Sequence, residues 1–237
     1  ECARAGIPKV IVVAGGFAEA GEKGKTLESR LAAIAKSSNT RILGPNTLGL
    51  FIPKNRLDTI FVEHGDKALA GGGGTAFISQ SGSVGTEALG LASNTGFGMR
   101  AFVGLGNKCD LDEIDFLAWF GKDPETTCLA FYIESMARGR EFLETAKEAS
   151  SRKPVVVLKA GRSESGAHAV GSHTGRLAGS DRVVGGAFRQ YGVQRVFDDE
   201  ELCDAAKTLS SLPSARGNRV ALLTPAGGYG VMGADHV

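Results

Sequence analysis

Residues 75–83 read TAFISQSGS, an apolar run followed at once by a turn of small residues. The run at 75–78 is typical of a buried parallel strand, and apolar residues at helical spacing begin at Val84. A strand that enters a helix through a tight turn is the repeating unit of α/β folds with a parallel sheet. This stretch therefore predicts an α/β fold.

The same alternation of strand and helix continues along the chain. Further strands are predicted at residues 9–14, 41–44, 100–104, 128–133, 155–159 and 192–196, the last of them at a sheet edge. Helices are predicted around residues 27–35, which Asn39 ends, and at 84–91, 112–120, 140–149, 181–191 and 199–212. Gly121 is predicted to end the helix at 112–120. The 34 glycines show no repeat, which fits many tight strand-to-helix turns.

The length of 237 residues favours more than one domain, since a domain typically takes roughly 100–200 residues. Residues 51–74 have no regular pattern and end in four glycines, so we predict a boundary there. The predicted units are residues 1–66, 67–213 and 214–237; the last restarts the strand-and-turn pattern at 219–224. The first residue is not methionine and no signal peptide follows, so we expect the chain to begin within a longer protein.

Composition and charge favour some classes of protein over others. The formal net charge of +1 indicates neither a nucleic-acid footprint nor a polybasic membrane patch. The four cysteines lie far apart without CxxC spacing, which argues against a zinc knuckle or a disulfide framework and fits a reducing cytoplasm. No run approaches the roughly 18 apolar residues of a membrane helix. We therefore expect a cytoplasmic protein whose partner is neither nucleic acid nor a membrane.

The turn Ser81, Gly82 and Ser83 stands between a strand and a helix, which is an anion-binding arrangement. The first N–H groups of a helix have no intrahelical partner, and its dipole adds about half a positive charge there. A phosphate can thus be held without lysine, with the two serine hydroxyls as added donors. The alternative is that these serines cap the helix for structural reasons alone.

A lone histidine, His173, lies in GSHTGRLAGS at residues 171–180, with almost no bulky side chain near it. The strand at 155–159 leads through glycines and serines into this stretch, so we expect a mobile loop and an exposed imidazole. Neutral imidazole attacks electrophiles and later leaves, which is the chemistry of a nucleophile. The alternative is a histidine that only makes hydrogen bonds in a surface turn.

A carboxylate, Glu134, follows the wholly apolar strand at 128–133. A charge placed there costs solvation unless something uses it, the alternative being that Glu134 caps the helix at 140–149. Loops at 44–49 and 104–108 also follow strands. Ligands bind at the carboxyl ends of parallel strands, so we expect the loops that carry these groups to meet at one sheet edge. The groups we expect there are Ser81, Gly106, Glu134 and His173.

Five motifs occur in order along the chain. They are GPNTLG at 44–49, SQSGS at 79–83, GLGNK at 104–108, IE at 133–134, and SHTG at 172–175 with LAGS at 177–180. In these motifs the chain resembles the nucleoside-diphosphate-forming acyl-CoA synthetases, meaning the ADP-forming acetyl-CoA synthetases and the α subunit of succinyl-CoA synthetase. The resemblance spans most of the chain. Residues 224–228 look like the opening of the family's next domain.

The resemblance implies a fold and a set of site residues. It implies a partial CoA-binding Rossmann-like domain, with residues 12–17 in its second half, followed by a flavodoxin-like parallel-sheet domain. His173 would be phosphorylated and paired with Glu134. The phosphate would be held by Ser81, Gly82, Ser83 and Gly175, CoA by Ala14, Gly15, Gly16 and Asn46, and the acyl substrate by Thr86, Gly106 and Asn107. No metal-ligating residue is expected.

The function that the resemblance implies is a ligase that interconverts acyl-CoA, ADP and phosphate with a carboxylic acid, CoA and ATP through a phosphohistidine. An ATP-grasp domain or β subunit outside this chain would bind ATP or ADP with Mg²⁺, and the enzyme would be an oligomer. One alternative is the regulatory CoA-binding region of a protein lysine acetyltransferase, although the retained His173 and Glu134 argue against it. Another is a flavodoxin-like flavin module, which would leave both residues unexplained.

Overall fold

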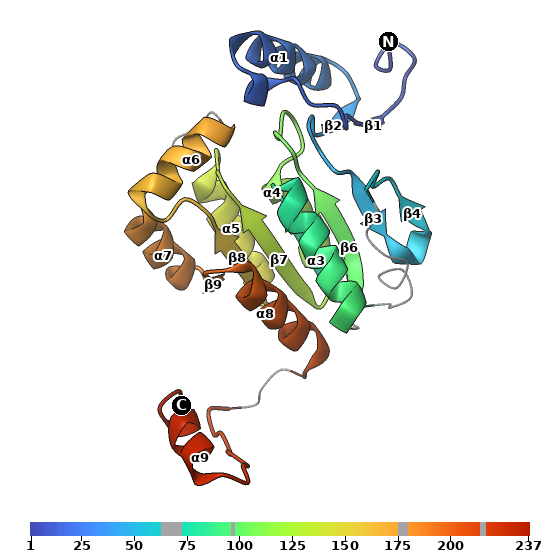
Figure 1. Ribbon diagram of the computed structural model, residues 1–237. Helices are drawn as coiled ribbons and strands as arrows, with labels where there is room; N and C mark the ends of the chain where they lie inside the picture. Colours follow the sequence, from blue (N-terminus) through green and yellow to red (C-terminus); the bar gives the residue numbers. More distant parts are fainter. Residues whose placement is uncertain (63–72, 96–97, 175–179, 214–216) are drawn as a thin grey trace.

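The computed structural model describes residues 1–62, 73–95, 98–174, 180–213 and 217–237 (Figure 1). Its strands are β1 (Lys9–Ile11), β2 (Arg41–Leu43), β3 (Leu50–Ile52), β4 (Leu57–Asp58), β5 (Thr75–Ser79), β6 (Met99–Gly104), β7 (Cys128–Ile133), β8 (Val155–Lys159) and β9 (Gln194–Val196). Its α-helices are α1 (Glu22–Ser37), α3 (Gly82–Thr95), α4 (Glu113–Lys122), α5 (Gly139–Ser150), α6 (Glu164–Thr174), α7 (Asp181–Gln190), α8 (Asp199–Ser211) and α9 (Gly227–Ala234). Short 3₁₀ turns are η1 (Ala18–Ala20) and η2 (Pro53–Asn55).

The larger sheet has the strand order β4-β3-β6-β5-β7-β8-β9. Strands β5 to β9 are parallel to one another, whereas β3 pairs antiparallel with both β4 and β6. The central strand β5 is buried at all five positions. A strand buried on both faces is largely apolar, which is why Ala76, Phe77 and Ile78 form a continuous apolar run. The predicted α/β fold with a parallel sheet is confirmed.

Helices cover both faces of this sheet (Figure 1). Apolar residues of α3 and α8, such as Leu89 and Leu202, pack in one core cluster with Phe77 of β5. Leu117 of α4 and Phe142 of α5 belong to the other cluster, on the opposite face. The sheet therefore forms the middle layer of three, the flavodoxin-like arrangement that the resemblance implied.

A second, two-stranded sheet pairs β1 with β2 in parallel, and α1 connects the two strands. Arg41 of β2 fastens this unit to the larger one, because its side chain forms ion pairs with Asp110 and Asp115. The main-chain N–H of Ile42 also donates to Asp110 (2.7 Å). Strand, helix and parallel strand form the βαβ unit expected of a partial Rossmann-like domain.

The expectation that residues 51–74 lack regular structure is wrong for their first part, which forms β3, η2 and β4. Phe51 is fully buried and β3 pairs with β6 in the large sheet. Three- and two-residue strands are too short to show a period of two in the sequence, so tertiary pairing decides them. The predicted boundary at residue 66 lies outside the residues that the structure describes.

The strand predicted at 219–224 is also wrong: these residues have no regular secondary structure. An apolar run becomes a strand only when another strand accepts its hydrogen bonds, and the described residues supply none. α9 follows this run and lies apart from the layers in Figure 1. Of the helices in the described part of the chain, none is long and apolar enough to span a membrane.

Candidate functional site

The carboxyl ends of the parallel strands meet at one edge of the large sheet. In the register of the sheet, Ser79 of β5 lies opposite Gly104 of β6 and Tyr132 of β7, and Ile133 lies opposite Lys159 of β8. The segments that follow these strands carry the SQSGS turn, the GLGNK loop, Glu134 and the lead into α6. The predicted gathering of these segments at one edge is confirmed.

The turn between β5 and α3 is held by hydroxyl groups. The Ser79 hydroxyl donates to the main-chain oxygen of Ser81 (2.6 Å), and the hydroxyls of Ser81 and Ser83 lie 3.1 Å apart. The N–H of Gly85 donates to the Ser81 carbonyl (3.2 Å), so the N–H groups of residues 82–84 lie in the first turn before it. Gly82 and Ser83 are exposed. This helix end can receive an anion from solvent.

Thr86, the predicted acyl-substrate contact, lies one turn further along α3. Its hydroxyl donates to the carbonyl of Gly82 (3.0 Å), the back-bonding that threonine often makes within helices. Its role toward a substrate stays a prediction.

Glu134 is buried, with 5% of the residue exposed. Its main-chain N–H donates to the Gln80 side-chain oxygen (3.0 Å), and its carbonyl accepts from the Lys159 ammonium (2.7 Å). Burial raises the pKa of Tyr132 to about 12, and the charge of Glu134 and a hydrogen bond with its carboxylate contribute to that rise. The phenol thus stays protonated as a donor to this carboxylate.

The alternative that Glu134 caps the following helix is wrong. α5 begins at Gly139 and Arg138 holds its N-cap position, with no side-chain cap. The guanidinium of Arg138 instead pairs with Asp112 and Glu141. Glu134 thus follows β7 at the sheet edge without capping α5.

The expectation of a loop around His173 is wrong in part, because the backbone is helical from Glu164 to Thr174 in α6. The hydroxyl of Ser163 accepts from the N–H of Gly166 (3.0 Å), which starts this helix. The side chains of residues 172–174, and all of Gly175, lie outside what the structure describes. The pairing of His173 with Glu134 and the phosphate role of Gly175 stay predictions.

An open cleft of about 810 Å³ lies beside α6, at the carboxyl ends of β7 and β8. Its lining includes Val84 of α3, Tyr132, Lys159, Arg162 and Phe197. Arg162 stacks over the Phe197 ring at 4.3 Å from its centre. The cleft thus connects the first turn of α3 with the strand end that precedes Glu134, and it is large enough for a small-molecule substrate.

The predicted CoA residues and two predicted acyl contacts meet at the junction of the two sheets. The Asn46 amide donates to the side-chain oxygen of Asn107 (3.3 Å), and a Cβ on Gly15 would lie 3.3 Å from Asn46 Oδ1. The N–H of Asn46 donates to the carbonyl of Ala14 (3.0 Å). Gly106 has φ +61°, and a Cβ there would lie 2.2 Å from the carbonyl oxygen of Pro45. The 44–49 and 104–108 loops are therefore docked on each other.

The glycine loop at this junction already binds a carboxylate of the chain itself. The N–H groups of Gly16 and Phe17 both donate to Glu19 Oε1 (2.6 and 3.1 Å). Burial raises the pKa of Glu19, but hydrogen bonds from Asn107 and from these N–H groups lower it overall. These main-chain donors thus suit an anionic group, which is what a phosphate of CoA would present.

Sequence reasoning missed three residues that hold the site together: Gln80, Lys108 and Lys159. Lys108 is buried against Glu113 (3.0 Å), and Lys159 is 5% exposed at the end of β8. A lysine that ends an apolar strand run is a usable signal, because lysine is almost never buried without partners. Gln80 and Lys108 belong to the SQSGS and GLGNK motifs, but nothing in the sequence singles out either residue within its motif.

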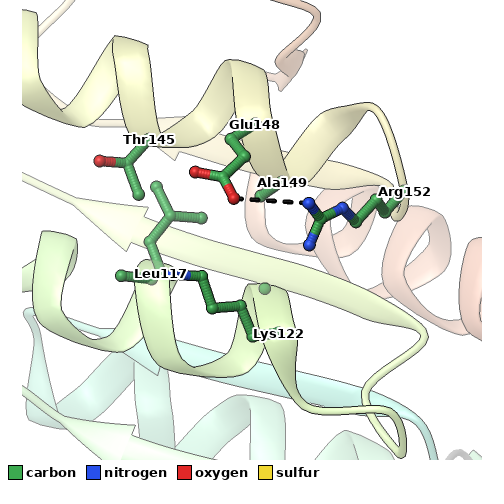
Figure 2. Close-up of a pocket in the computed structure, with 8 residues that line it drawn as sticks. Leu117, Lys122, Thr145, Glu148, Ala149 and Arg152 are labelled. Atoms are coloured by element: carbon green, nitrogen blue, oxygen red, sulfur yellow. Dashed lines mark ion pairs between the residues drawn. The ribbon is translucent and has the colours of Figure 1, made fainter.

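A further hollow lies away from the sheet edge and is small. A hollow of about 30 Å³ between α4 and α5, at the far end of these helices, is lined by Leu117, Thr145 and Arg152 among others (Figure 2). It has room for about one water molecule. Within the described residues, no group of three or more His, Cys, Asp or Glu side chains could hold a metal ion.

Comparison with known proteins gives consistent matches. The model of the family described as "Succinyl-CoA ligase like flavodoxin domain" matches residues 72–209. The α subunit of acetate–CoA ligase [ADP-forming] I from Pyrococcus furiosus is 43% identical over 99% of this chain and 50% of its own length. Acetate–CoA ligase [ADP-forming] from Methanocaldococcus jannaschii is 38% identical over 99% of this chain and 32% of its own length.

A solved structure from the same group of enzymes also matches the chain. The dinucleotide-forming acetyl-coenzyme A synthetase 1 of Ca. Korarchaeum cryptofilum, in complex with phosphate and ADP, matches with a TM-score of 0.92 and 39% identity. The match covers 99% of this chain and 50% of that one. The chain spans about half the length of these α-subunit and synthetase relatives or less. From these matches and from the motifs at one sheet edge, the chain belongs to the nucleoside-diphosphate-forming acyl-CoA synthetase family.

Proposed function

We propose that this chain carries the acyl-transfer and phosphoryl-accepting part of an ADP-forming acyl-CoA synthetase. The enzyme would interconvert acyl-CoA, ADP and phosphate with a carboxylic acid, CoA and ATP. The observation that carries the proposal is the placement of Glu134, a buried carboxylate tied through Gln80 to the anion-receiving end of α3. Relatives whose names specify ADP-forming ligases support this assignment.

In the first step, a phosphate oxygen attacks the thioester carbon, the C–S bond breaks, and the thiolate leaves as CoA. The product is an acyl phosphate. The N–H groups of residues 82–84 and the hydroxyls of Ser81 and Ser83 would hold the phosphate during this attack. Binding at a helix end needs no cation from the protein, so the same donors can serve inorganic phosphate and the acyl phosphate.

In the second step, a ring nitrogen of His173 attacks phosphorus and the bond from phosphorus to the acyl oxygen breaks. The carboxylic acid leaves as its carboxylate. The ring gains positive charge, and Glu134 would orient the ring and balance that charge, as the carboxylate of a catalytic triad does. ADP then takes the phosphoryl group as the P–N bond breaks, which yields ATP and restores the neutral imidazole.

The junction of the two sheets is the part of this proposal that concerns CoA. Ala14, Gly15, Gly16 and Asn46 would bind CoA, and Gly106 and Asn107 would face the acyl group together with Thr86. The N–H groups of Gly16 and Phe17, which now bind Glu19, support an anion here. Asn107 touches both Glu19 and Asn46, so it lies between the two proposed ligands.

The partners follow from the same proposal. ATP or ADP with Mg²⁺ would be bound by an ATP-grasp domain, either fused or on a separate β subunit, within an oligomer. The Pyrococcus relative is named as an α subunit, which supports a separate partner. The domain organisation that we propose remains residues 1–66 for CoA, 67–213 for the phosphohistidine unit and 214–237 for the start of a further domain.

The test is phosphorylation of the full-length protein, with its nucleotide-binding domain or subunit, by radiolabelled phosphate and acyl-CoA or by labelled ATP. We expect an acid-labile and base-stable label, because phosphohistidine hydrolyses in acid and survives base. His173→Ala should abolish the label, whereas His168→Ala, an exposed histidine on the same helix, should keep it. A label that persists in His173→Ala, or no label on the wild type, contradicts the proposal. The latter outcome would favour the regulatory region of a lysine acetyltransferase.

A further inference from the structure

The peptide groups of Glu134 and Ser135 are held by side chains, not by the backbone pattern of a sheet or helix. The N–H groups of both residues donate to the Gln80 side-chain oxygen (3.0 and 3.1 Å). The Glu134 carbonyl accepts from the Lys159 ammonium (2.7 Å), and the Ser135 carbonyl accepts from the Lys108 ammonium (2.6 Å). Four consecutive main-chain polar groups are thus fixed from three different segments of the chain.

Two of these three side chains, Gln80 and Lys108, also contact each other. The Lys108 ammonium donates to the same Gln80 oxygen (3.1 Å) and pairs with Glu113 (3.0 Å), where both charged side chains are 2% exposed. The Gln80 amide donates to the Ser135 hydroxyl (3.2 Å). A buried ion pair gives little net stability, because desolvation consumes most of its Coulomb energy. The ion pair of Lys108 with Glu113 lies next to the end of β7, and stability alone does not account for it.

We infer that Gln80, Lys108 and Lys159 are positioning residues that fix the Glu134 carboxylate at the phosphate-binding edge. This inference rests on the proposed function, and it adds the residues through which Glu134 acts. Gln80 lies directly before Ser81, so the hydrogen bonds that fix Glu134 also fix its distance from the turn at α3. A misplacement of about 1 Å can slow a reaction about 10²-fold, which is why a rigid support matters here.

Lys159 gives the sharpest test, because the chain offers a matched lysine. Lys153 lies just before β8 and Lys159 ends it, so the two lie at opposite ends of the same strand. Lys153 also donates to two main-chain carbonyls, those of Phe120 and Asp123, and burial lowers the pKa of both lysines. Both lysines donate hydrogen bonds from a partly or fully buried ammonium group to main-chain carbonyls, but of the two only Lys159 contacts the Glu134 peptide.

The experiment compares Lys159→Met, Lys159→Arg and Lys153→Met in the full-length enzyme with its nucleotide-binding domain or subunit. We measure phosphoenzyme formation in a single turnover, KM for acyl-CoA and the melting temperature. Lys159→Met should lower the phosphorylation rate about 10²-fold with KM nearly unchanged, and Lys159→Arg, which keeps two donors, should recover most of the loss. Lys153→Met should lower the melting temperature but leave the phosphorylation rate at the wild-type value.

Equal rates for Lys159→Met and Lys153→Met would overturn the inference. A raised KM with an unchanged rate would make Lys159 a substrate contact, which also overturns it. Gln80→Met is measured in parallel, and if neither it nor Lys159→Met folds, the contacts hold the fold and not the site. A wild-type enzyme that takes no label at all would instead contradict the proposed function, so the two failures are distinguishable.

Discussion

At the scale of single residues, the carboxylate of Glu134 is separate from the hydrogen bonds that hold its backbone. Gln80 and Lys159 contact main-chain atoms of Glu134, whereas Tyr132 contacts its carboxylate. A change confined to the carboxylate therefore tests charge without disturbing position.

We predict that Glu134→Gln leaves the circular dichroism spectrum unchanged and slows phosphorylation by about 10²-fold or more, because the imidazole loses its orienting charge. Rapid-quench measurement of phosphoenzyme checks this. Glu144→Gln, an exposed position on α5, is the control and should react at the wild-type rate. Wild-type turnover by Glu134→Gln would remove Glu134 from the mechanism.

Gly106 combines two demands that only glycine meets. Its φ of +61° is in the left-handed region, and a Cβ would lie 2.2 Å from the Pro45 oxygen. Gly106→Ala should destabilise the protein by about 1–3 kcal/mol and weaken CoA binding, since the 44–49 loop must move. Gly90→Ala is the matched control, because nothing lies within 4 Å of its Cβ. It should stabilise α3 by up to about 1 kcal/mol, as urea denaturation would show.

Asp123 gives a prediction about pH. Burial raises its pKa, but hydrogen bonds from Thr126, the Glu125 N–H and Arg100 lower it overall from the ordinary value of 3.8. The folded state therefore favours the charged carboxylate, and this stability is present above pH 3.8 and lost as pH falls toward the folded pKa.

Asp123→Asn should consequently cost about 1–3 kcal/mol at pH 7 and show a shallower loss of stability below pH 3.8 than the wild type. Urea titrations at several pH values measure both effects. The exposed Asp204→Asn should follow the wild-type profile. An unchanged acid limb in Asp123→Asn would show that other carboxylates govern acid unfolding.

At the scale of elements, the sequence predicted strands best where both faces are buried. β7 and β8 have the predicted bounds, because a continuous apolar run has sharp ends. The stop predicted at Gly121 is wrong by two residues: α4 continues to Lys122, and Gly121 packs closely against Ala149 of α5. A glycine that serves helix packing looks the same in sequence as one that ends a helix.

Local sequence patterns also failed to predict α6 and the side chains that hold the Glu134 and Ser135 peptides. Serine and glycine around His173 indicated a loop, but the Ser163 hydroxyl starts a helix that reaches Thr174. Gln80, Lys108 and Lys159 act across three strand ends, and only the strand order brings them together. The sequence predicted that these loops lie at one edge of the sheet. It did not predict which side chains of distant loops contact one another, because those contacts depend on the three-dimensional arrangement.

At the scale of the whole molecule, residues 217–237 are separate from the layered unit. None of them is buried, and seven of their large apolar side chains are at least half exposed: Val220, Leu222, Leu223, Tyr229, Val231, Met232 and Val237. α8, by contrast, buries Leu202 against the sheet.

Ending the chain after Pro213 should therefore change the melting temperature by less than about 2 °C, since no buried apolar area is lost. The shorter chain should also bind less of a hydrophobic dye. Ending it after Phe197 removes α8 and should abolish cooperative unfolding. A large fall in melting temperature from the first truncation would mean that the exposed segment contributes to the core after all.

The pairing of β3 with β6 has a consequence for dividing the gene. A cut at the predicted boundary would leave β3 and β4 on the first polypeptide, while the strand they complete, β6, would be on the second. The second polypeptide would then expose a sheet edge with Phe102 and Val103 unpaired, and the first would carry the matching strand. We therefore expect the two halves to recognise each other through these main-chain hydrogen bonds when they are made in the same cell, as the pieces of a split reporter do.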